Sequence, residues 1–470
     1  MKTFSRVLAL ILFCAASGLA ESPNPPAMRV DFYHSGNSTS QLFSLDRVVI
    51  EPLPWPGAMT EKARLDTTNL GRYFFEVRDR ATGALLYSRG FSSIFGEWET
   101  TEEAKTLNRS FQESLRFPRF DQPLRIVLKQ RDPQNGWQQV WEVNVDAKDM
   151  FVDTSRPPSA GPLITIEKNG ESADKVDFLI LGDGYTAAQR PKCEADARRL
   201  TRILFSTTPY KEHEKDFNVW ALCPAAAESG ISRPSTGVHR HSPVGATYDA
   251  FGSERYVLTF DNRSLRELAS WAPYEFVEII TNSDTYGGGG IFGLYSTVAA
   301  DSHWAPYVFV HEFGHHFAGL ADEYYTSDVS YLPPTARTEP WEPNVTALLD
   351  SKLLKWRDLV KAGTPLPTAW EKQSFESYAK SVQEKRKQIR KENRPESEMD
   401  ALFTAEREHE EQILGGGTYA NAVGAFEGAN YEATGYYRPQ TNCIMFTRTP
   451  HFCEVCQAAI EKVIRFYTAK

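Results

Sequence analysis

The spacing of hydrophobic residues changes along the chain, and its first part is typical of strands. Residues 29–152 hold short apolar and aromatic runs separated by turn signals such as Asn135-Gly136. The runs that predict strands are 47–50, 73–77, 85–87, 124–128 and 140–145. Strands at this spacing predict a small β-sandwich, and we find no catalytic cluster among them.

Residues 153–162 are rich in proline and predict a linker, after which the pattern is different. Buried strands are predicted at 176–181, 217–222, 256–260 and 276–280, with a charged helical stretch over 187–205. Strands that alternate with helices favour a mixed α/β domain over 163–470. The predicted fold class is therefore α+β, with an N-terminal β-sandwich followed by an α/β domain.

A segment at about 343–417 interrupts this second pattern. Its runs Glu384-Lys-Arg-Lys-Gln-Ile-Arg-Lys-Glu and Ala405-Glu-Arg-Glu-His-Glu-Glu411 are dense in charges of both signs. Such runs predict a solvated helix with many salt bridges, which we favour over a binding arm. We interpret the segment as a charged helical insertion.

The first twenty residues have the pattern of a secretory signal peptide. Lys2 and Arg6 precede the apolar run 7–16, and small residues at 18–20 suit a cleavage site before Glu21. The run is too short to span a membrane, and no later run reaches about eighteen apolar residues. The sequence thus predicts an exported protein, periplasmic or secreted, without stable membrane insertion.

Length, charge and cysteine content narrow the picture further. A chain of 470 residues exceeds the usual size of one hydrophobic core. The net charge of −9 argues against nucleic acid as a partner. Five cysteines remain after the signal peptide, and an exported chain favours disulfides. We expect a bridge from Cys443 to either Cys453 or Cys456, because no second Cys-x-x-Cys pair completes a four-cysteine metal site.

The run His311-Glu312-Phe-Gly-His315 carries the clearest chemistry. It follows the apolar residues 307–310, so a helix with a buried face is expected. Histidines four apart lie on one side of a helix and can share a zinc ion. Zinc lowers the pKa of a coordinated water toward about 7, and Glu312 is placed to accept its proton as a general base.

Further ligands are expected after the helix. Gly319 can turn the chain sharply, and Asp322 and Glu323 follow it, so either carboxylate can complete three protein ligands. Met445 is expected in a turn that forms a floor beneath the metal. A short glycine run at 287–290 suggests a flexible approach to a strand that borders the cleft, where an extended substrate could pair. His316 points about 100° away from His315, so we expect a structural role for it.

This arrangement resembles the metzincin metallopeptidases, in which a third ligand follows the glycine by three residues. The resemblance favours Asp322 as the third ligand, with Glu323 as a residue that orients the site. The chain departs from the pattern in two ways, since Gly319 comes four residues after His315 and the third ligand is not histidine.

Longer segments resemble the bacterial IgA-peptidase family of zinc metallopeptidases. They are 178–186 (FLILGDGYT), 311–324 (HEFGHHFAGLADEY), 424–431 (GAFEGANY) and 437–456, and the residues 43–55 and 96–101 are similar to the family's leading β-rich domain. The resemblance implies one zinc ion per chain and a protein or peptide substrate. Immunoglobulin cleavage does not follow from it.

These observations predict an exported zinc-dependent endopeptidase with a metal-activated water. Tyr436 and Tyr437 are candidates for stabilising the transition state. Two alternatives are a zinc amidase that acts on cell-wall or glycan-linked amides, and a noncatalytic binding or adhesion protein with a metal site. Glu312 argues against the second, because a structural site needs no base and usually closes with a fourth protein ligand.

Overall fold

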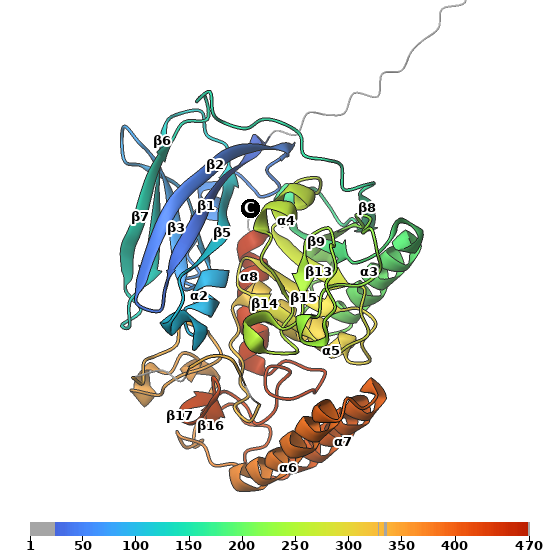
Figure 1. The fold of residues 1–470 in the computed structure, drawn as a ribbon. Helices are drawn as coiled ribbons and strands as arrows, with labels where there is room; N and C mark the ends of the chain where they lie inside the picture. Colours follow the sequence, from blue (N-terminus) through green and yellow to red (C-terminus); the bar gives the residue numbers. More distant parts are fainter. Residues whose placement is uncertain (1–23, 328, 333–335, 469–470) are drawn as a thin grey trace, which may run out of the picture.

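Strands fill the first third of the chain, and the longest helices lie in the last third (Figure 1). The structure is a computed structural model that describes residues 24–327, 329–332 and 336–468. The predicted signal peptide at 1–20 lies outside the described residues. The mixed α+β architecture expected from the sequence is confirmed.

Two antiparallel sheets, ordered β2-β1-β5 and β4-β3-β6-β7, form the N-terminal part and enclose one core that is rich in aromatic residues. Its elements are β1 (Pro26–Asn37), β2 (Ser40–Pro54), α1 (Glu61–Arg64), β3 (Tyr73–Asp79), β4 (Leu85–Phe91), α2 (Ile94–Trp98), β5 (Arg109–Pro118), β6 (Leu124–Arg131) and β7 (Trp137–Val145). The five predicted strands fall within β2, β3, β4, β6 and β7.

The sequence did not reveal β1 and β5, because charged residues occupy buried positions in them. Arg29 and Asp31 on β1 are both almost fully buried, and their side chains lie 2.7 Å apart in an ion pair. Glu113 on β5 is buried as well. Paired charges inside a sheet remove the alternation of apolar and polar residues on which strand prediction depends.

A six-stranded sheet ordered β14-β15-β13-β9-β10-β8 forms the centre of the remaining chain. The four inner strands run parallel, and both edge strands are antiparallel to their neighbours. The elements from here to the C-terminus are β8 (Ile164–Glu167), β9 (Val176–Asp183), α3 (Arg190–Leu204), β10 (Phe217–Leu222), β11 (Ala246–Thr247), β12 (Leu258–Thr259), α4 (Asn262–Ala269), β13 (Phe276–Thr281), β14 (Gly288–Ile291), β15 (Tyr295–Ala299), α5 (Ala305–Ala318), α6 (Lys372–Lys391), α7 (Glu396–Gly415), β16 (Phe426–Ala429), β17 (Glu432–Arg438) and α8 (Glu454–Tyr467).

Both faces of this sheet are covered, which explains its uninterrupted apolar strands. Along β9, Phe178 and Ile180 pack in the core that contains α3, α5 and α8, whereas Leu179 and Leu181 pack on the opposite face with α4. The α2 segment of the N-terminal part, including Phe95, belongs to that second core. The two parts of the chain are thus joined by shared packing.

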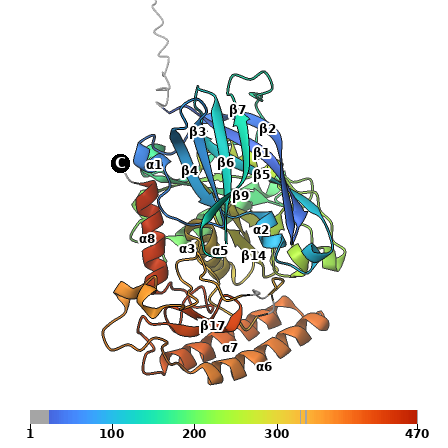
Figure 2. The same ribbon diagram turned by 90° about the vertical axis from the view of Figure 1, so that its left-hand side faces the viewer.

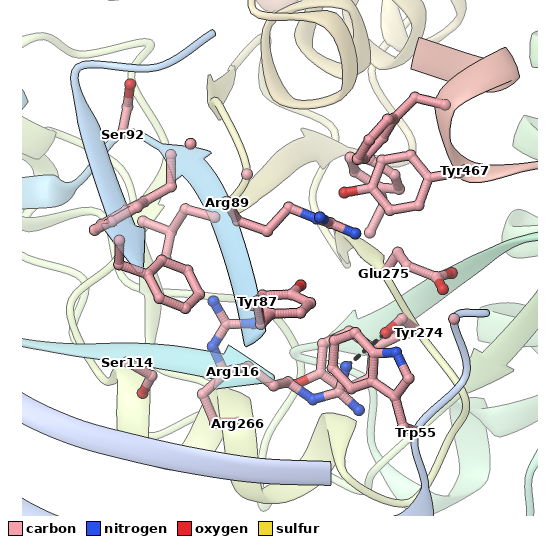
Figure 3. Close-up of a pocket in the computed structure, with 18 of the residues that line it drawn as sticks. Trp55, Tyr87, Arg89, Ser92, Ser114, Arg116, Arg266, Tyr274, Glu275 and Tyr467 are labelled. Atoms are coloured by element: carbon pink, nitrogen blue, oxygen red, sulfur yellow. Dashed lines mark hydrogen bonds between the residues drawn. The ribbon is translucent and has the colours of Figure 1, made fainter. Parts of the chain in front are cut away.

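A small cavity of about 100 Å³ lies at a second junction, where β4 and β5 meet the larger part (Figure 3). Arg116 donates a hydrogen bond of 2.8 Å to the carbonyl of Tyr274. Arg89 stacks against Tyr87 and against Phe466 of α8, each 4.7 Å from the ring centroid. Figure 2 shows the C-terminal end of α8 beside β4. Arg89 thus joins β4 to the last helix, and Arg116 joins β5 to the segment before β13.

The charged segment forms the paired helices α6 and α7 at one end of the molecule (Figures 1 and 2). Salt bridges occur within the segment as predicted, for example Arg390 to Glu396 at 2.5 Å, and Arg390 also contacts Glu254 outside it at 3.1 Å. The pair is more than a solvated element, since Phe375, Met399 and Phe403 are buried in the main core. No helix within the described ranges is long and apolar enough to cross a bilayer.

The expected bridge from Cys443 is wrong. The structure joins Cys193 to Cys223 instead and leaves Cys443, Cys453 and Cys456 as buried thiols. Cys193 lies on α3 and Cys223 directly follows β10, so the crossover from β9 to β10 brings together two residues that are 30 apart in sequence.

Candidate metal centre

Helix α5 carries His311, Glu312 and His315 and ends at Gly319. Gly319 has a left-handed φ of 61°, and a Cβ at this position would lie 2.7 Å from the ring of Trp341. Glycine is therefore required both by the turn and by the close packing. The turn sends the chain back along the helix, so that residues 320–323 pass the two histidines.

Three ligand atoms converge at this place. The Nε2 atoms of His311 and His315 are 3.1 Å apart, and Asp322 Oδ1 lies 3.1 Å from the first and 3.2 Å from the second. Nitrogen ligands at about 2.1 Å from a tetrahedral zinc ion lie roughly 3.4 Å apart. Asp322 Oδ1 is buried and accepts no hydrogen bond from the described residues. The donor set and its spacing fit a divalent metal.

Hydrogen bonds at the other ring nitrogens orient both imidazoles. His311 Nδ1 lies 2.8 Å from the carbonyl oxygen of Ile444, and His315 Nδ1 lies 2.5 Å from that of Leu320. A carbonyl oxygen only accepts, so each Nδ1 carries the proton. In its neutral form, which metal binding requires, each ring keeps a lone pair on Nε2, which faces the shared point.

Adjacent acids Asp322 and Glu323 turn to different surroundings. Burial lowers the pKa of His315, but contact with Asp322 outweighs it and raises that pKa to about 9. Burial would raise the pKa of Asp322, whereas the two histidines hold it well below its usual value. Glu323 faces away and accepts a 2.9 Å hydrogen bond from Asn344. The geometry thus brings Asp322, and not Glu323, to the histidines.

Glu312 lies beside the ligand atoms on the wall of a cavity. Burial raises the pKa of its carboxyl group, and the nearby His311 and His315 oppose that shift. A carboxylate with a raised pKa is a stronger base than one in water, which suits proton transfer near neutral pH. Its half-buried side chain keeps contact with the cavity.

The cavity has a volume of about 690 Å³ and is lined by distant segments of the chain. The larger part contributes the metal cluster, which is our name for His311, Glu312, His315 and Asp322, together with Arg255 and several tyrosines. The N-terminal part contributes Arg72 and Glu97. Burial raises the pKa of Glu97. Sequence reasoning missed these residues because it assigned no catalytic feature to the N-terminal sheets; the nearest signal was the segment 96–101.

The glycine run forms an edge strand itself, so its prediction as a flexible approach is wrong. β14 packs tightly against α5, and a Cβ on Gly290 would lie 2.3 Å from the carbonyl oxygen of Glu312. Gly288 exchanges backbone hydrogen bonds of 3.1 Å with the segment 255–257. Because polar groups alternate along a strand, those of Gly290 point to the same side, and Gly290 lines the cavity.

The tip of the β16–β17 hairpin contacts Asp322. Tyr431 Oη donates a 2.6 Å hydrogen bond to Asp322 Oδ2, and Asn430 N donates to the carbonyl of Asp322 at 3.0 Å. Both tip residues have positive φ, as the tight turn requires. Tyr431 lies 109 residues from Asp322, so no local pattern linked the two.

The other predicted residues lie outside the cavity lining. Tyr436 and Tyr437 are buried on β17, and Tyr436 Oη accepts a hydrogen bond of 3.3 Å from Thr338 N. The structure therefore does not bring them to the metal cluster. Met445 packs beneath α5, with Sδ 3.2 Å from where a Cβ on Gly314 would lie.

His316 has a structural environment. Its Nε2 accepts a 3.1 Å hydrogen bond from Val277 N, and its Nδ1 lies 3.1 Å from the carbonyl of Ile291. Burial lowers its pKa to about 3, so the ring stays neutral between the sheet and the helix. Both nitrogens are engaged within the protein.

Comparison with known proteins places these observations in a family. A family model described as IgA Peptidase M64 matches residues 164–464, and one described as Peptidase M64 N-terminus matches residues 21–142. No curated protein matches the chain. The first match covers more than half of the chain and includes every residue of the metal cluster.

Proposed function

The chain belongs to the M64 family of peptidases and is a hydrolase of peptide bonds, and on this premise we propose that it is an exported zinc endopeptidase with Glu312 as general base. Family membership implies a metallopeptidase, which excludes the noncatalytic alternative. The observation that supports this proposal most directly is the convergence of His311, His315 and Asp322 beside Glu312 on one cavity wall. One zinc ion is assigned to this cluster.

The roles of the residues follow from their positions. His311, His315 and Asp322 would hold the metal, which supplies Lewis acidity toward a carbonyl and a lowered pKa for water. Glu312 accepts the proton of the attacking water and delivers it to the leaving amine. Tyr431 holds Asp322 by its 2.6 Å hydrogen bond, so it positions a ligand without reacting itself.

Substrate binding is assigned to the edge of the six-stranded sheet. Gly290 presents its backbone N–H and C=O toward the cavity, next to α5. An extended peptide can pair with such an edge, and this pairing orients the scissile bond independently of side-chain sequence. Glu97 and Arg72 face the same cavity from the N-terminal part and would contact residues farther along the substrate.

The test is hydrolysis of denatured casein by the purified protein, with Glu312→Gln as the matched variant. We expect cleavage by the wild type, its loss with a chelator and its recovery with zinc. Peptidoglycan fragments serve as the second substrate, because cleavage of those alone would favour the amidase alternative. No cleavage of protein by the zinc-loaded enzyme would overturn the endopeptidase assignment.

Export has a separate test. The N-terminus of protein recovered from culture fractions can be determined by mass spectrometry. We expect the mature chain to begin at Glu21 and to be found outside the cytoplasm. An intact N-terminus with a cytoplasmic location would contradict export and leave the peptidase assignment unaffected.

A further inference from the structure

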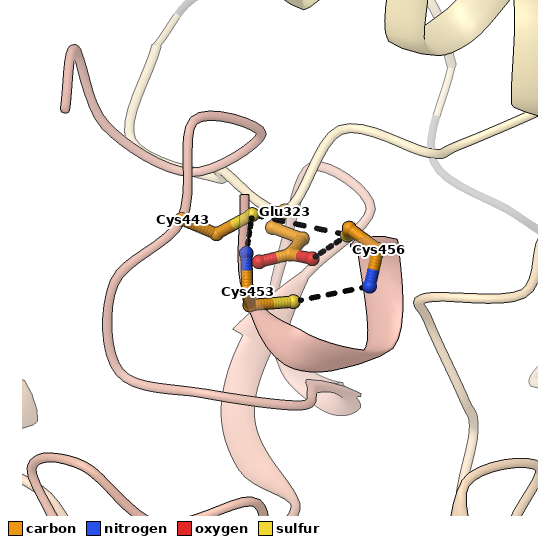
Figure 4. Close-up of side chains that lie close together, drawn as sticks. All are labelled: Glu323, Cys443, Cys453 and Cys456. Carbon is orange, nitrogen blue, oxygen red and sulfur yellow. Dashed lines mark hydrogen bonds between the residues drawn. The ribbon is translucent and has the colours of Figure 1, made fainter. Parts of the chain in front are cut away.

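A second cluster of side chains that can bind a metal begins at Glu323, the residue after Asp322. Glu323, Cys443, Cys453 and Cys456 are all buried, and their ligand atoms lie within 4.8 Å of one another (Figure 4). The cysteines come from the segment before Met445 and from the start of α8. The cluster is independent of the cavity that contains Glu312, since none of the four residues lines it.

The distances within the cluster fit tetrahedral coordination. Cys443 Sγ is 3.8 Å from Cys456 Sγ, and Cys456 Sγ is 3.4 Å from Glu323 Oε1. Sulfur ligands about 2.3 Å from one zinc ion lie roughly 3.8 Å apart, and a sulfur and a carboxylate oxygen roughly 3.5 Å apart. The observed spacings match a set of four ligands around one ion.

The carboxylate supplies an independent indication. Glu323 Oε2 is buried and has no hydrogen-bond partner among the described residues. A buried carboxylate oxygen without a partner is costly unless a cation balances it. Arg438 is a buried cation close enough to act electrostatically on Glu323 and Cys443, but it bonds instead to the carbonyl of Gly428 at 2.8 Å.

The backbone around the thiols favours thiolate ligands. Cys453 N donates to Cys443 Sγ at 3.2 Å, and Cys456 N donates to Cys453 Sγ at 3.5 Å. Cys453 caps α8, where the positive end of the helix dipole stabilises a negative sulfur. One disulfide among the three cysteines would leave a thiol and the acid without a partner.

We propose that Glu323, Cys443, Cys453 and Cys456 form a second, closed metal site that takes zinc or a similar thiophilic divalent ion. Four protein ligands leave no open position, so the site is structural. Binding would release the protons of the thiols. The assignment rests on this cluster alone and does not depend on the peptidase mechanism.

The position of this site indicates that the ion would join two segments of the catalytic centre. Glu323 N donates a 2.8 Å hydrogen bond to the carbonyl of Met445, and the preceding Ile444 carbonyl accepts from His311. An ion between Glu323 and Cys443 would therefore clamp the segment that carries Asp322 to the segment that orients His311. The structural ion would hold two parts of the catalytic centre in register.

Cobalt substitution tests the proposal without reference to activity. Metal-free protein loaded with Co²⁺ should show thiolate-to-cobalt charge-transfer absorption in the near ultraviolet, which the His311, His315 and Asp322 cluster cannot produce because it has no sulfur. Elemental analysis of the zinc-loaded protein should give two metal equivalents per chain. A single equivalent without the charge-transfer band would overturn the proposal.

Cys453→Ser is the informative variant, because a serine hydroxyl can still cap α8 while it binds zinc poorly. We expect the charge-transfer band to weaken strongly and one metal equivalent to be lost. Glu454→Gln, which changes an exposed acid at the next position, is the matched control and should retain both. A disulfide among Cys443, Cys453 and Cys456, mapped by mass spectrometry of unreduced protein, would also overturn the proposal.

Discussion

The peptide bond between Asp322 and Glu323 separates two clusters that differ in ligand chemistry and in access. The cluster of His311, His315 and Asp322 opens to a cavity of about 690 Å³, whereas the cluster around Glu323 is buried on all sides. A catalytic metal needs an open position for water or substrate, and a structural metal does not. Adjacent acids therefore acquire different roles from the direction in which each side chain leaves the backbone.

The buried acids of the N-terminal sheets show a third arrangement. Asp31 contacts Arg29 at 2.7 Å and Arg47 at 2.9 Å, and Glu51 contacts Arg116 at 2.7 Å. Arginine side chains supply the compensating charge there, so these acids need no metal. Asp322 and Glu323 each retain a buried oxygen without a hydrogen bond to the described residues. In both cases that acid lies beside other side chains that can bind a metal, and this combination distinguishes Asp322 and Glu323 from the arginine-balanced acids.

Exchanging each adjacent acid for its amide should have the largest effect and separates the clusters directly. Asp322→Asn should lose the metal of the histidine cluster and nearly all activity, because two histidines alone hold zinc weakly. Glu323→Gln should instead lose the metal bound by the thiols. Elemental analysis reports the loss in both, and the cobalt–thiolate band distinguishes them, since it should persist only in Asp322→Asn. The reverse result would show that the third ligand is Glu323.

Glu312→Gln should lower kcat/KM by about 10²- to 10⁴-fold while both metals remain bound. The amide keeps the shape of the side chain and cannot accept the proton of water. Activity on casein and metal content are measured on the same preparation. Full activity with a normal metal content would contradict the role of Glu312 as general base, and loss of metal would show that Glu312 is itself a ligand.

Tyr431→Phe tests how far the open cluster depends on its support. Loss of the 2.6 Å hydrogen bond to Asp322 leaves that ligand free to turn, and such changes typically cost about 10- to 100-fold in metal affinity. Competition with a chromogenic chelator measures the affinity. Tyr437→Phe, on the same hairpin but outside the cavity lining, is the control and should match the wild type. Equal affinities for all three proteins would exclude the supporting role.

Local patterns predicted the parts of the site that lie on one element. The four-residue spacing of His311 and His315 required only a helix, and Gly319 marked its end. Tyr431 and Glu97 could not be found in this way, because tertiary packing alone brings them to the cavity. The true Cys193–Cys223 bridge was missed for the same reason, since it depends on the β9–β10 crossover. The sequence did not predict β1 and β5, because charged residues are buried in both strands.

The smallest effect is expected in the N-terminal ion cluster, which should respond to acid and not to chelator. Burial would raise the pKa of Asp31, but Arg29 and Arg47 hold it below its ordinary value of 3.8. Because the pKa of Asp31 is lower in the folded chain than in the unfolded chain, its ionised form stabilises the fold. This stabilisation is complete at pH values above the unfolded-state pKa and is lost as the pH falls through the folded-state pKa. Hydrogen-exchange protection factors for β1 peptides, already corrected for the intrinsic pH dependence of exchange, should therefore fall only below about pH 4.

Chelation at neutral pH should leave the protection of β1 peptides unchanged, because Arg29 and not a metal balances the charge of Asp31. Peptides around Asp322 and Cys443 should instead lose protection. Loss of β1 protection on chelation would mean that the metal clusters stabilise both parts of the chain through the α2 packing, and the contrast between arginine-balanced and metal-balanced acids would no longer hold.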